Sequence, residues 1–204
     1  MKEHRSVQQV VRLLSLLGIE CPVRPDTPPR PDVFVEFNAR RIAIAIETTD
    51  FHGDETRHGG SATRRDEQQD AAAGRVRAYP VPIDPLPGLV SRIRAKVSKR
   101  YDLSGMEEAW LAIFAGVPQL GATAATFLLP TFLNCHALTA HTSDSLEASV
   151  FRCAYILCEL TEVEQPKLYS WEKGRAWTEV RLLGQHTPRP SPFWEIKRQF
   201  FRKE

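Results

Sequence analysis

Hydrophobic and polar residues follow two different periods along the chain, and each period predicts a type of element. Residues 3–17 carry valine and leucine at helical spacing, which predicts an amphipathic helix that ends at Gly18. Residues 33–37 are β-branched and aromatic, and residues 41–47 alternate isoleucine with small or polar residues. Both runs predict β-strands, and residues 38–40 between them predict a short hairpin turn.

Proline-rich stretches and later apolar runs complete the predicted order. Residues 21–30 and 79–88 hold four prolines each, which predicts extended connectors. Residues 61–78 are polar and rich in alanine, which predicts a solvent-facing helix. The elements predicted after the second connector are a helix at 89–101, a buried strand at 110–115, a covering helix at 119–141 that Pro130 starts or kinks, a buried strand at 150–160, and a hairpin made of 167–171 and 177–183.

This order predicts an α/β fold with a central sheet flanked by helices. A chain of 204 residues suits a single domain, residues 1–204. Residues 50–88 are then an insertion within that domain, made of a loop and the polar helix. The sequence contains no internal repeat and no low-complexity tract.

The composition limits which binding partners and which cellular compartment are expected for this domain. Its 42% apolar and 25% charged residues are ordinary for a globular protein, and a net charge of +2 does not by itself indicate a nucleic-acid partner. The four cysteines show neither metal-ligand spacing nor a disulfide framework, which favours buried thiols in a reducing compartment. The amino terminus is amphipathic rather than a signal peptide, and no apolar run is long enough to span a membrane. We therefore expect a cytoplasmic protein without a membrane partner; a homodimer is compatible with the sequence.

Two acidic residues flank the predicted hairpin. Asp32 precedes the first strand and Glu47 ends the second. Antiparallel pairing across a tight turn places the start of one strand beside the end of the other, so both carboxylates are expected at one edge of the sheet. Mg²⁺ or Mn²⁺ suits such a pair, since a hard cation binds through one or two carboxylates and keeps several waters.

These residues resemble the motif of the PD-(D/E)XK superfamily of metal-dependent nucleases. The motif reads Pro31-Asp32 on the first strand and Glu47-Thr48-Thr49 on the second, with Thr49 in the place of the usual lysine. The resemblance is closest to bacterial members whose second strand ends in isoleucine-glutamate-x-threonine, and the order of elements fits over most of the chain. It implies a restriction-endonuclease-like mixed sheet, Asp32 and Glu47 as metal ligands, and hydrolysis of phosphodiester bonds, with DNA preferred.

A neutral threonine cannot replace the charge of the motif lysine. Some members of the superfamily supply that lysine from a neighbouring helix, and Lys96 on the predicted helix at 89–101 is the candidate here, with Thr49 positioning a water. The alternative is a surface lysine that lies over the edge of the core. Some members also add a glutamate from the first helix. Glu3 has that place, although a solvated glutamate that favours the helix dipole explains it as well.

Basic side chains near the cleft are candidates for phosphate contacts. Arg64 and Arg65 on the inserted helix, and Lys99 beside Lys96, would bind nucleic acid in a nuclease. Internal ion pairs on a solvated helix explain the two arginines equally well. Aromatic and basic residues also mix at 193–203, where a closing amphipathic helix is favoured over stacking on bases.

The sequence leaves more than one function open. The first is a Mg²⁺- or Mn²⁺-dependent nuclease, and the second is a non-catalytic module of the same fold that binds nucleic acid or a partner protein. A small-molecule enzyme that uses the acidic edge is a weaker third. Purely structural roles also fit, because an aspartate before a strand can be a turn residue and a glutamate at a strand's end can be an exposed terminator. The histidines at 52 and 58 lack zinc-ligand spacing, as do those at 136 and 141.

Overall fold

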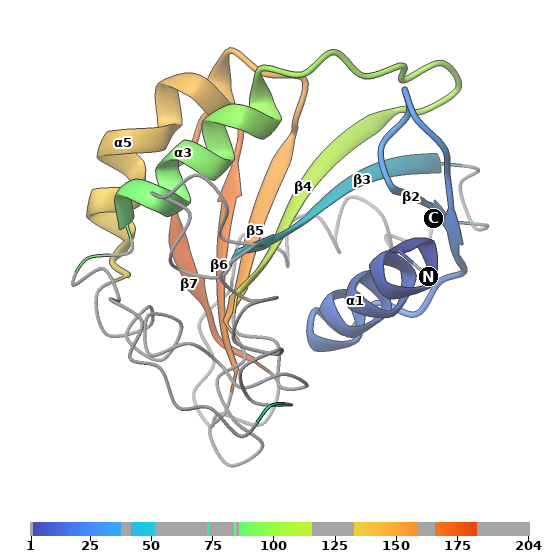
Figure 1. Cartoon of the computed structure of the whole chain (residues 1–204), viewed down its shortest axis with the longest axis horizontal. Helices are drawn as coiled ribbons and strands as arrows, with labels where there is room; N and C mark the ends of the chain where they lie inside the picture. The colour runs from blue at the N-terminus through green and yellow to red at the C-terminus, as the bar shows by residue number, and fades with distance from the viewer. Residues whose placement is uncertain are drawn as a thin grey trace, which may run out of the picture.

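A mixed sheet with helices on both faces forms the body of the protein (Figure 1). The computed structural model describes residues 2–37, 42–51, 73, 84, 86–115, 133–158 and 166–182, apart from the side chains of residues 2–4 and 37. The described helices are α1 (Lys2–Leu16), α3 (Leu86–Val97) and α5 (Cys135–Glu147). The described strands are β1 (Val23–Pro25), β2 (Val33–Phe37), β3 (Ile42–Phe51), β4 (Glu108–Ala115), β5 (Cys153–Cys158), β6 (Lys167–Glu172) and β7 (Thr178–Val180).

The strands lie in the sheet in the order in which they occur along the chain, from β1 to β7. β1, β2 and β3 pair antiparallel, β3, β4 and β5 pair parallel, and β5, β6 and β7 pair antiparallel again. The parallel strands are central, and β5 is buried along its whole length. This burial matches the continuous apolar sequence of β5, because central parallel strands are covered on both faces.

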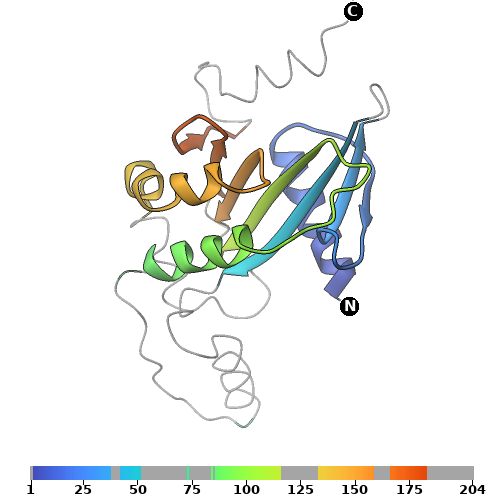
Figure 2. The same ribbon diagram turned by 90° about the horizontal axis from the view of Figure 1, so that it is seen from above.

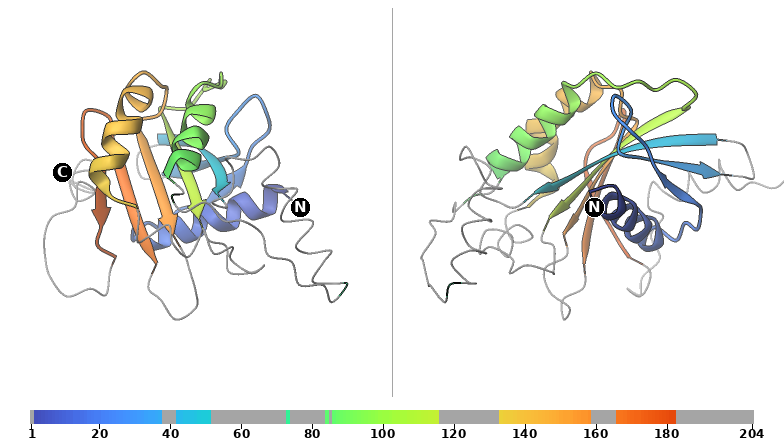
Figure 3. Two further views of the ribbon diagram at one scale, coloured as in Figure 1. Left: turned by 60° about the vertical axis from the view of Figure 1, so that its left-hand side comes forward. Right: turned by 45° about the vertical axis from the view of Figure 1, so that its right-hand side comes forward.

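The connection from β3 to β4 contains α3, the connection from β4 to β5 contains α5, and both helices lie on the same face of the sheet. The chain moves in one direction from β3 to β4 to β5, and right-handed crossovers then place α3 and α5 together. Two views of the ribbon confirm this arrangement, and of the described helices α1 is the one on the opposite face (Figures 2 and 3). The first predicted helix therefore lies across the sheet from the two later ones.

The two faces of the sheet hold separate hydrophobic clusters. Leu89 and Ile93 of α3 and Leu138 of α5 pack on the side chains of β4 that point to their face, Leu111 among them. On the other face, α1 packs Val10, Leu13 and Leu14 against isoleucines and valines of β2 and β3. Successive residues of β3 thus point to different helices, which sets the surroundings of the acidic residue near its end.

The structure confirms the α/β class and most of the predicted elements. The hairpin strands, both buried strands, the helix near 89 and the late hairpin all form, with shifts of a few residues at their ends. His136 and His141 are exposed on α5, as expected for helix-surface residues. The thiols of Cys153 and Cys158 are buried, also as predicted.

Three expectations about element bounds need correction, and a fourth is tested only in part. The connector at 21–30 contains β1, because an edge strand tolerates Pro25. The described part of the predicted covering helix is α5, which begins at Cys135, since Asn134 caps it by accepting a hydrogen bond from the Ala137 N–H. Residues 119–132 of that prediction lie outside the described residues. The predicted insertion at 50–88 is shorter at both ends, because β3 continues to Phe51 and α3 begins at Leu86. The second connector, predicted at 79–88, therefore ends before Leu86.

Other predictions fall on residues outside those described. They are most of the polar helix at 61–78 with Arg64 and Arg65, the turn at 38–40, the histidines at 52 and 58, and the segment at 193–203. Within the described segments, no helix combines the length and the apolar character needed to cross a membrane.

Candidate functional site

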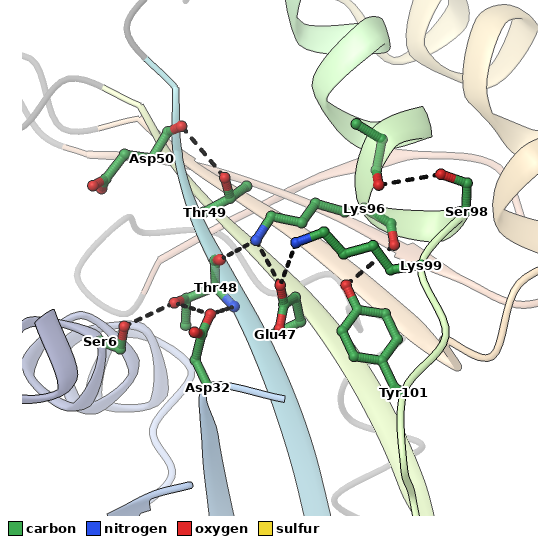
Figure 4. Close-up of polar contacts among 11 residues, drawn as sticks. Ser6, Asp32, Glu47, Thr48, Thr49, Asp50, Lys96, Ser98, Lys99 and Tyr101 are labelled. Carbon is green, nitrogen blue, oxygen red and sulfur yellow. Dashed lines mark hydrogen bonds and ion pairs between the residues drawn. The ribbon is translucent and has the colours of Figure 1, made fainter. Parts of the chain in front are cut away.

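The β2–β3 hairpin brings Asp32 beside the second half of β3, as its predicted pairing requires. Val33 pairs with Ile46, so the residue before β2 lies beside Glu47 and Thr48. Oδ2 of Asp32 accepts hydrogen bonds from the backbone N–H of Thr48 at 2.9 Å and from its hydroxyl at 2.8 Å. β2 begins only at Val33, and the Asp32 side chain accepts the N–H in place of a strand carbonyl. The aspartate is therefore held at the edge of the sheet (Figure 4).

Glu47 points to the opposite side of β3 from Thr48 and meets α3. Nζ of Lys96 donates to Oε1 of Glu47 at 2.5 Å and to the carbonyl oxygen of Thr48 at 2.9 Å. The Glu47 side chain is 6% exposed and that of Lys96 is 11% exposed. A carboxylate buried to this degree is stable as an anion only when it is paired, and Lys96 provides the pair.

A second ammonium approaches the same carboxylate. Nζ of Lys99 lies 3.9 Å from Oε1 of Glu47, and the Lys99 side chain is 56% exposed. Lys96 is in the last turn of α3, which Leu89 and Ile93 anchor to the sheet, and Lys99 is in the turn that follows. Glu47 therefore has two positive charges beside it, one nearly buried and one open to solvent.

Tyr101 follows α3 in the chain and lies next to the site. Its hydroxyl donates to the carbonyl oxygen of Lys96 at 3.1 Å, and its ring packs edge-on against Phe151 with centroids 5.5 Å apart. Burial raises the pKa of Tyr101 above its ordinary value, and the carboxylates of Glu47 and Asp32 raise it further. Because both acids act on one hydroxyl, Tyr101 lies in the neighbourhood that they share.

The other side of β3 carries a polar network with α1. Oγ of Ser6 lies 3.0 Å from Oγ1 of Thr48, and Ser6 is the donor because Thr48 gives its single hydroxyl proton to Asp32. Asp50, two residues further, accepts from Nε2 of Gln9 at 2.6 Å and pairs with Nη2 of Arg5 at 3.1 Å. Helix α1 is thus connected to the acidic edge through hydroxyl groups and through its own ion pair.

The structure brings together four of the residues that the sequence singled out, namely Asp32, Glu47, Lys96 and Lys99. Asp32, Glu47 and Lys96 meet directly or through Thr48. Thr49 follows in β3, 8% exposed, and its hydroxyl is 3.5 Å from the carbonyl oxygen of Asp50, at the limit of a hydrogen bond. Lys99 adds the outer charge.

Three of the predicted site residues lie partly or wholly outside the described atoms. The backbone of Glu3 belongs to α1, but its side chain lies outside the described atoms, as do Arg64 and Arg65 entirely. The structure adds four residues to the site that the sequence did not indicate: Ser6, Thr48, Asp50 and Tyr101. Their contribution depends on contacts between distant elements, and only Thr48 had a local signal, as the middle residue of the motif.

The oxygen atoms at this edge suit a hard cation. Glu47 Oε1 and the Thr48 carbonyl already bind a cationic group, the Lys96 ammonium, and the carboxylate of Asp32, which precedes β2, is hydrogen-bonded to Thr48. Oxygen ligands of this type are those that Mg²⁺ and Mn²⁺ take. Among the described residues, no group of three or more histidine, cysteine, aspartate and glutamate side chains is placed to hold a metal ion.

Comparison with known proteins adds no relative to this picture. No protein-family model matches the sequence, and a search of curated proteins finds no match.

Proposed function

We propose that the protein is a Mg²⁺- or Mn²⁺-dependent nuclease that hydrolyses phosphodiester bonds at the acidic edge of the sheet. The observation that carries the proposal is the convergence of Glu47 Oε1 and the Thr48 carbonyl oxygen on one cationic group beside Asp32. The resemblance of Pro31-Asp32 and Glu47-Thr48-Thr49 to the PD-(D/E)XK motif supports the same reading. Under this proposal the sheet and its helices are a restriction-endonuclease-like core.

Asp32, Glu47 and the Thr48 carbonyl would hold the divalent cation. Such a cation, when bound, lowers the pKa of a water and offsets negative charge at phosphorus. The protein supplies what surrounds it: Thr48 and Ser6 fix the orientation of Asp32, and α3 brings Lys96 to Glu47. The preference for DNA rests on the family resemblance alone.

Lys96 replaces the charge that Thr49 lacks. Its ammonium comes from α3 and lies beside Glu47 and the carbonyl oxygen of Thr48, the residue before Thr49 (Figure 4). An ammonium near the reacting phosphate stabilises negative charge that develops on a phosphate oxygen. Among the described residues, the Thr49 hydroxyl has a long contact to the carbonyl oxygen of Asp50, and a hydroxyl can also hold a water.

Isosteric substitutions of the two acids test this proposal. Asp32→Asn and Glu47→Gln should each reduce Mg²⁺-dependent cleavage of DNA by about 100-fold or more, as expected when a group that stabilises transition-state charge is lost. Glu36→Gln is the matched control, because Glu36 is an acid on β2 that pairs with Arg24 away from the site. Cleavage that persists in both site variants and is insensitive to EDTA would contradict the mechanism.

A second candidate is a non-catalytic module that binds nucleic acid or a partner protein. Two observations favour it: Thr49 stands in the lysine position, and Glu47 is already neutralised by two lysines. This candidate predicts no cleavage of DNA or RNA with either metal, together with binding of nucleic acid that weakens steeply as salt rises.

A further inference from the structure

The ammonium of Lys96 lies where two oxygen atoms of β3 converge. It is 2.5 Å from Glu47 Oε1 and 2.9 Å from the Thr48 carbonyl oxygen, in a setting where its own side chain is 11% exposed. These are two of the oxygens that the proposed metal site needs. A divalent ion bound to them would stand within about 2 Å of each, too close for an ammonium to keep the same contacts. Strong repulsion between the two cations would add to the conflict.

We propose that Lys96 is an intramolecular competitor for the metal site, so that the divalent cation binds by displacing its ammonium from Glu47 and Thr48. This inference rests on the proposed function, because it takes the cation to use those oxygens. Lys96 then has two alternative positions. In the metal-free protein its ammonium neutralises Glu47, and in the loaded protein it is released toward the substrate.

The backbone around Lys96 confines this displacement to its side chain. Its carbonyl oxygen accepts from the Tyr101 hydroxyl at 3.1 Å and from the Lys99 N–H at 3.2 Å, and Ile93 one turn earlier is fully buried. The helix is therefore fixed, while the four-carbon stem of the lysine can change rotamer. A nucleic-acid phosphate is the anion that would receive the released ammonium.

Lys99, in the turn that follows α3, provides the matched comparison. Its Nζ lies 3.9 Å from the same Glu47 oxygen, and its side chain is 56% exposed. It therefore contributes positive charge near the site without holding both oxygens. Removing either lysine removes one charge, but only removal of Lys96 removes the competitor.

Binding measurements on the full chain separate these effects. Isothermal titration with MnCl₂, without nucleic acid, should give about tenfold or greater tightening for Lys96→Met and a clearly smaller change for Lys99→Met, since an exposed charge is screened. Lys96→Arg keeps a cation at the position and should bind Mn²⁺ no more tightly than the wild type. Equal tightening in Lys96→Met and Lys99→Met, or no tightening, would overturn the inference.

A second measurement uses the wild-type protein and needs no substitution. Acetic anhydride acetylates exposed lysines, and mass spectrometry gives the extent at each position. Saturating MgCl₂ should raise acetylation of Lys96 several-fold relative to Lys99, because displacement exposes a side chain that is now almost buried. An unchanged ratio under conditions where the titration shows bound metal would overturn the inference.

The outcomes distinguish this inference from the function on which it rests. Metal binding by the wild type without displacement of Lys96 overturns the inference and leaves the nuclease proposal standing. Metal binding by Lys96→Met but not by the wild type supports the competition and overturns the metal-dependent nuclease. Absence of metal binding in both proteins overturns both.

Discussion

Thr48 donates both its backbone N–H and its hydroxyl to one carboxylate oxygen of Asp32, at 2.9 and 2.8 Å. The hydroxyl in turn accepts from Ser6 of α1, so a single threonine connects the first helix to the acidic edge. Thr48 is 5% exposed, so these three contacts, and a fourth from the Lys96 ammonium to its carbonyl oxygen, are largely shielded from water. The middle residue of the motif thus fixes one of its two acids.

Thr48→Val should lower stability, because it keeps the shape of the side chain but removes the hydroxyl. We expect the free energy of unfolding to fall by about 1–3 kcal/mol, the usual effect of losing a hydrogen bond to a charged group. Urea denaturation followed by circular dichroism measures it. Ser6→Ala removes only the outer hydroxyl and should have a smaller effect; a larger loss in Ser6→Ala than in Thr48→Val would contradict the connection described above.

Tyr101→Phe should destabilise the protein by about 1 kcal/mol, since the ring stays packed on Phe151 while the hydrogen bond to Lys96 is lost. The pKa of Tyr101 is raised by its burial and by the nearby Glu47, so the unfolded chain loses the phenolic proton first as pH rises. Its contribution is complete below about pH 10, the pKa of an unfolded tyrosine, and declines above it.

Unfolding experiments from pH 8 to pH 11 test this dependence. The free energy of unfolding should fall less steeply above pH 10 in Tyr101→Phe than in the wild type. Parallel curves across the whole range would show that Tyr101 has the same pKa in the folded and unfolded chains.

Ile93→Ala should affect both stability and the site. Ile93 is fully buried between α3 and the sheet, and truncating such a residue costs about 2–5 kcal/mol. Since Lys96 follows it by one turn, we also expect reduced cleavage in a protein that still folds. Ser91→Ala changes an exposed position of the same helix and should stay within about 0.5 kcal/mol of the wild type in guanidinium denaturation.

The buried thiols should react only when the chain unfolds. Burial raises the pKa of Cys153 and of Cys158 to about 12, and that of Cys21 to about 11, so few thiolates form at pH 8. Ellman's reagent should label Cys153 and Cys158 slowly in native buffer and rapidly in guanidinium. Unfolded thiols release protons near pH 8.5, so these residues also make stability fall as pH rises above that value. Rapid native labelling of either residue would contradict their burial.

The hairpin and its acids could be predicted because their signals are local. Strand period, turn length and the positions of Asp32 and Glu47 together determine which residues meet across an antiparallel pair, and the observed register agrees. The placement of Lys96 followed from the helical stripe of α3, which points Lys96 to the same side as Ile93. Each of these predictions required only the residue pattern of one element and its position relative to the neighbouring element.

Other features could not be obtained in that way. Tyr101 reaches the site from beyond the end of α3, and Ser6 reaches it from a helix on the opposite face, so neither has a sequence signal. The start of α5 at Cys135 is signalled by the capping residue Asn134, which the continuous apolar pattern at 119–133 obscured. β1 was missed because prolines predict a connector, although an edge strand accepts them.

The alternation of β3 between two helices has a consequence for changes in chain length. Glu47 faces Lys96 on one side, while Thr48 and Asp50 face Ser6 and Gln9 on the other. Inserting or deleting one residue ahead of Glu47 within the strand would turn the carboxylate toward α1, and a deletion would also bring the Thr48 hydroxyl under the lysine. The spacing of this strand is therefore as strict a requirement as the identity of its residues, and a homologue or engineered variant should change length in its loops instead.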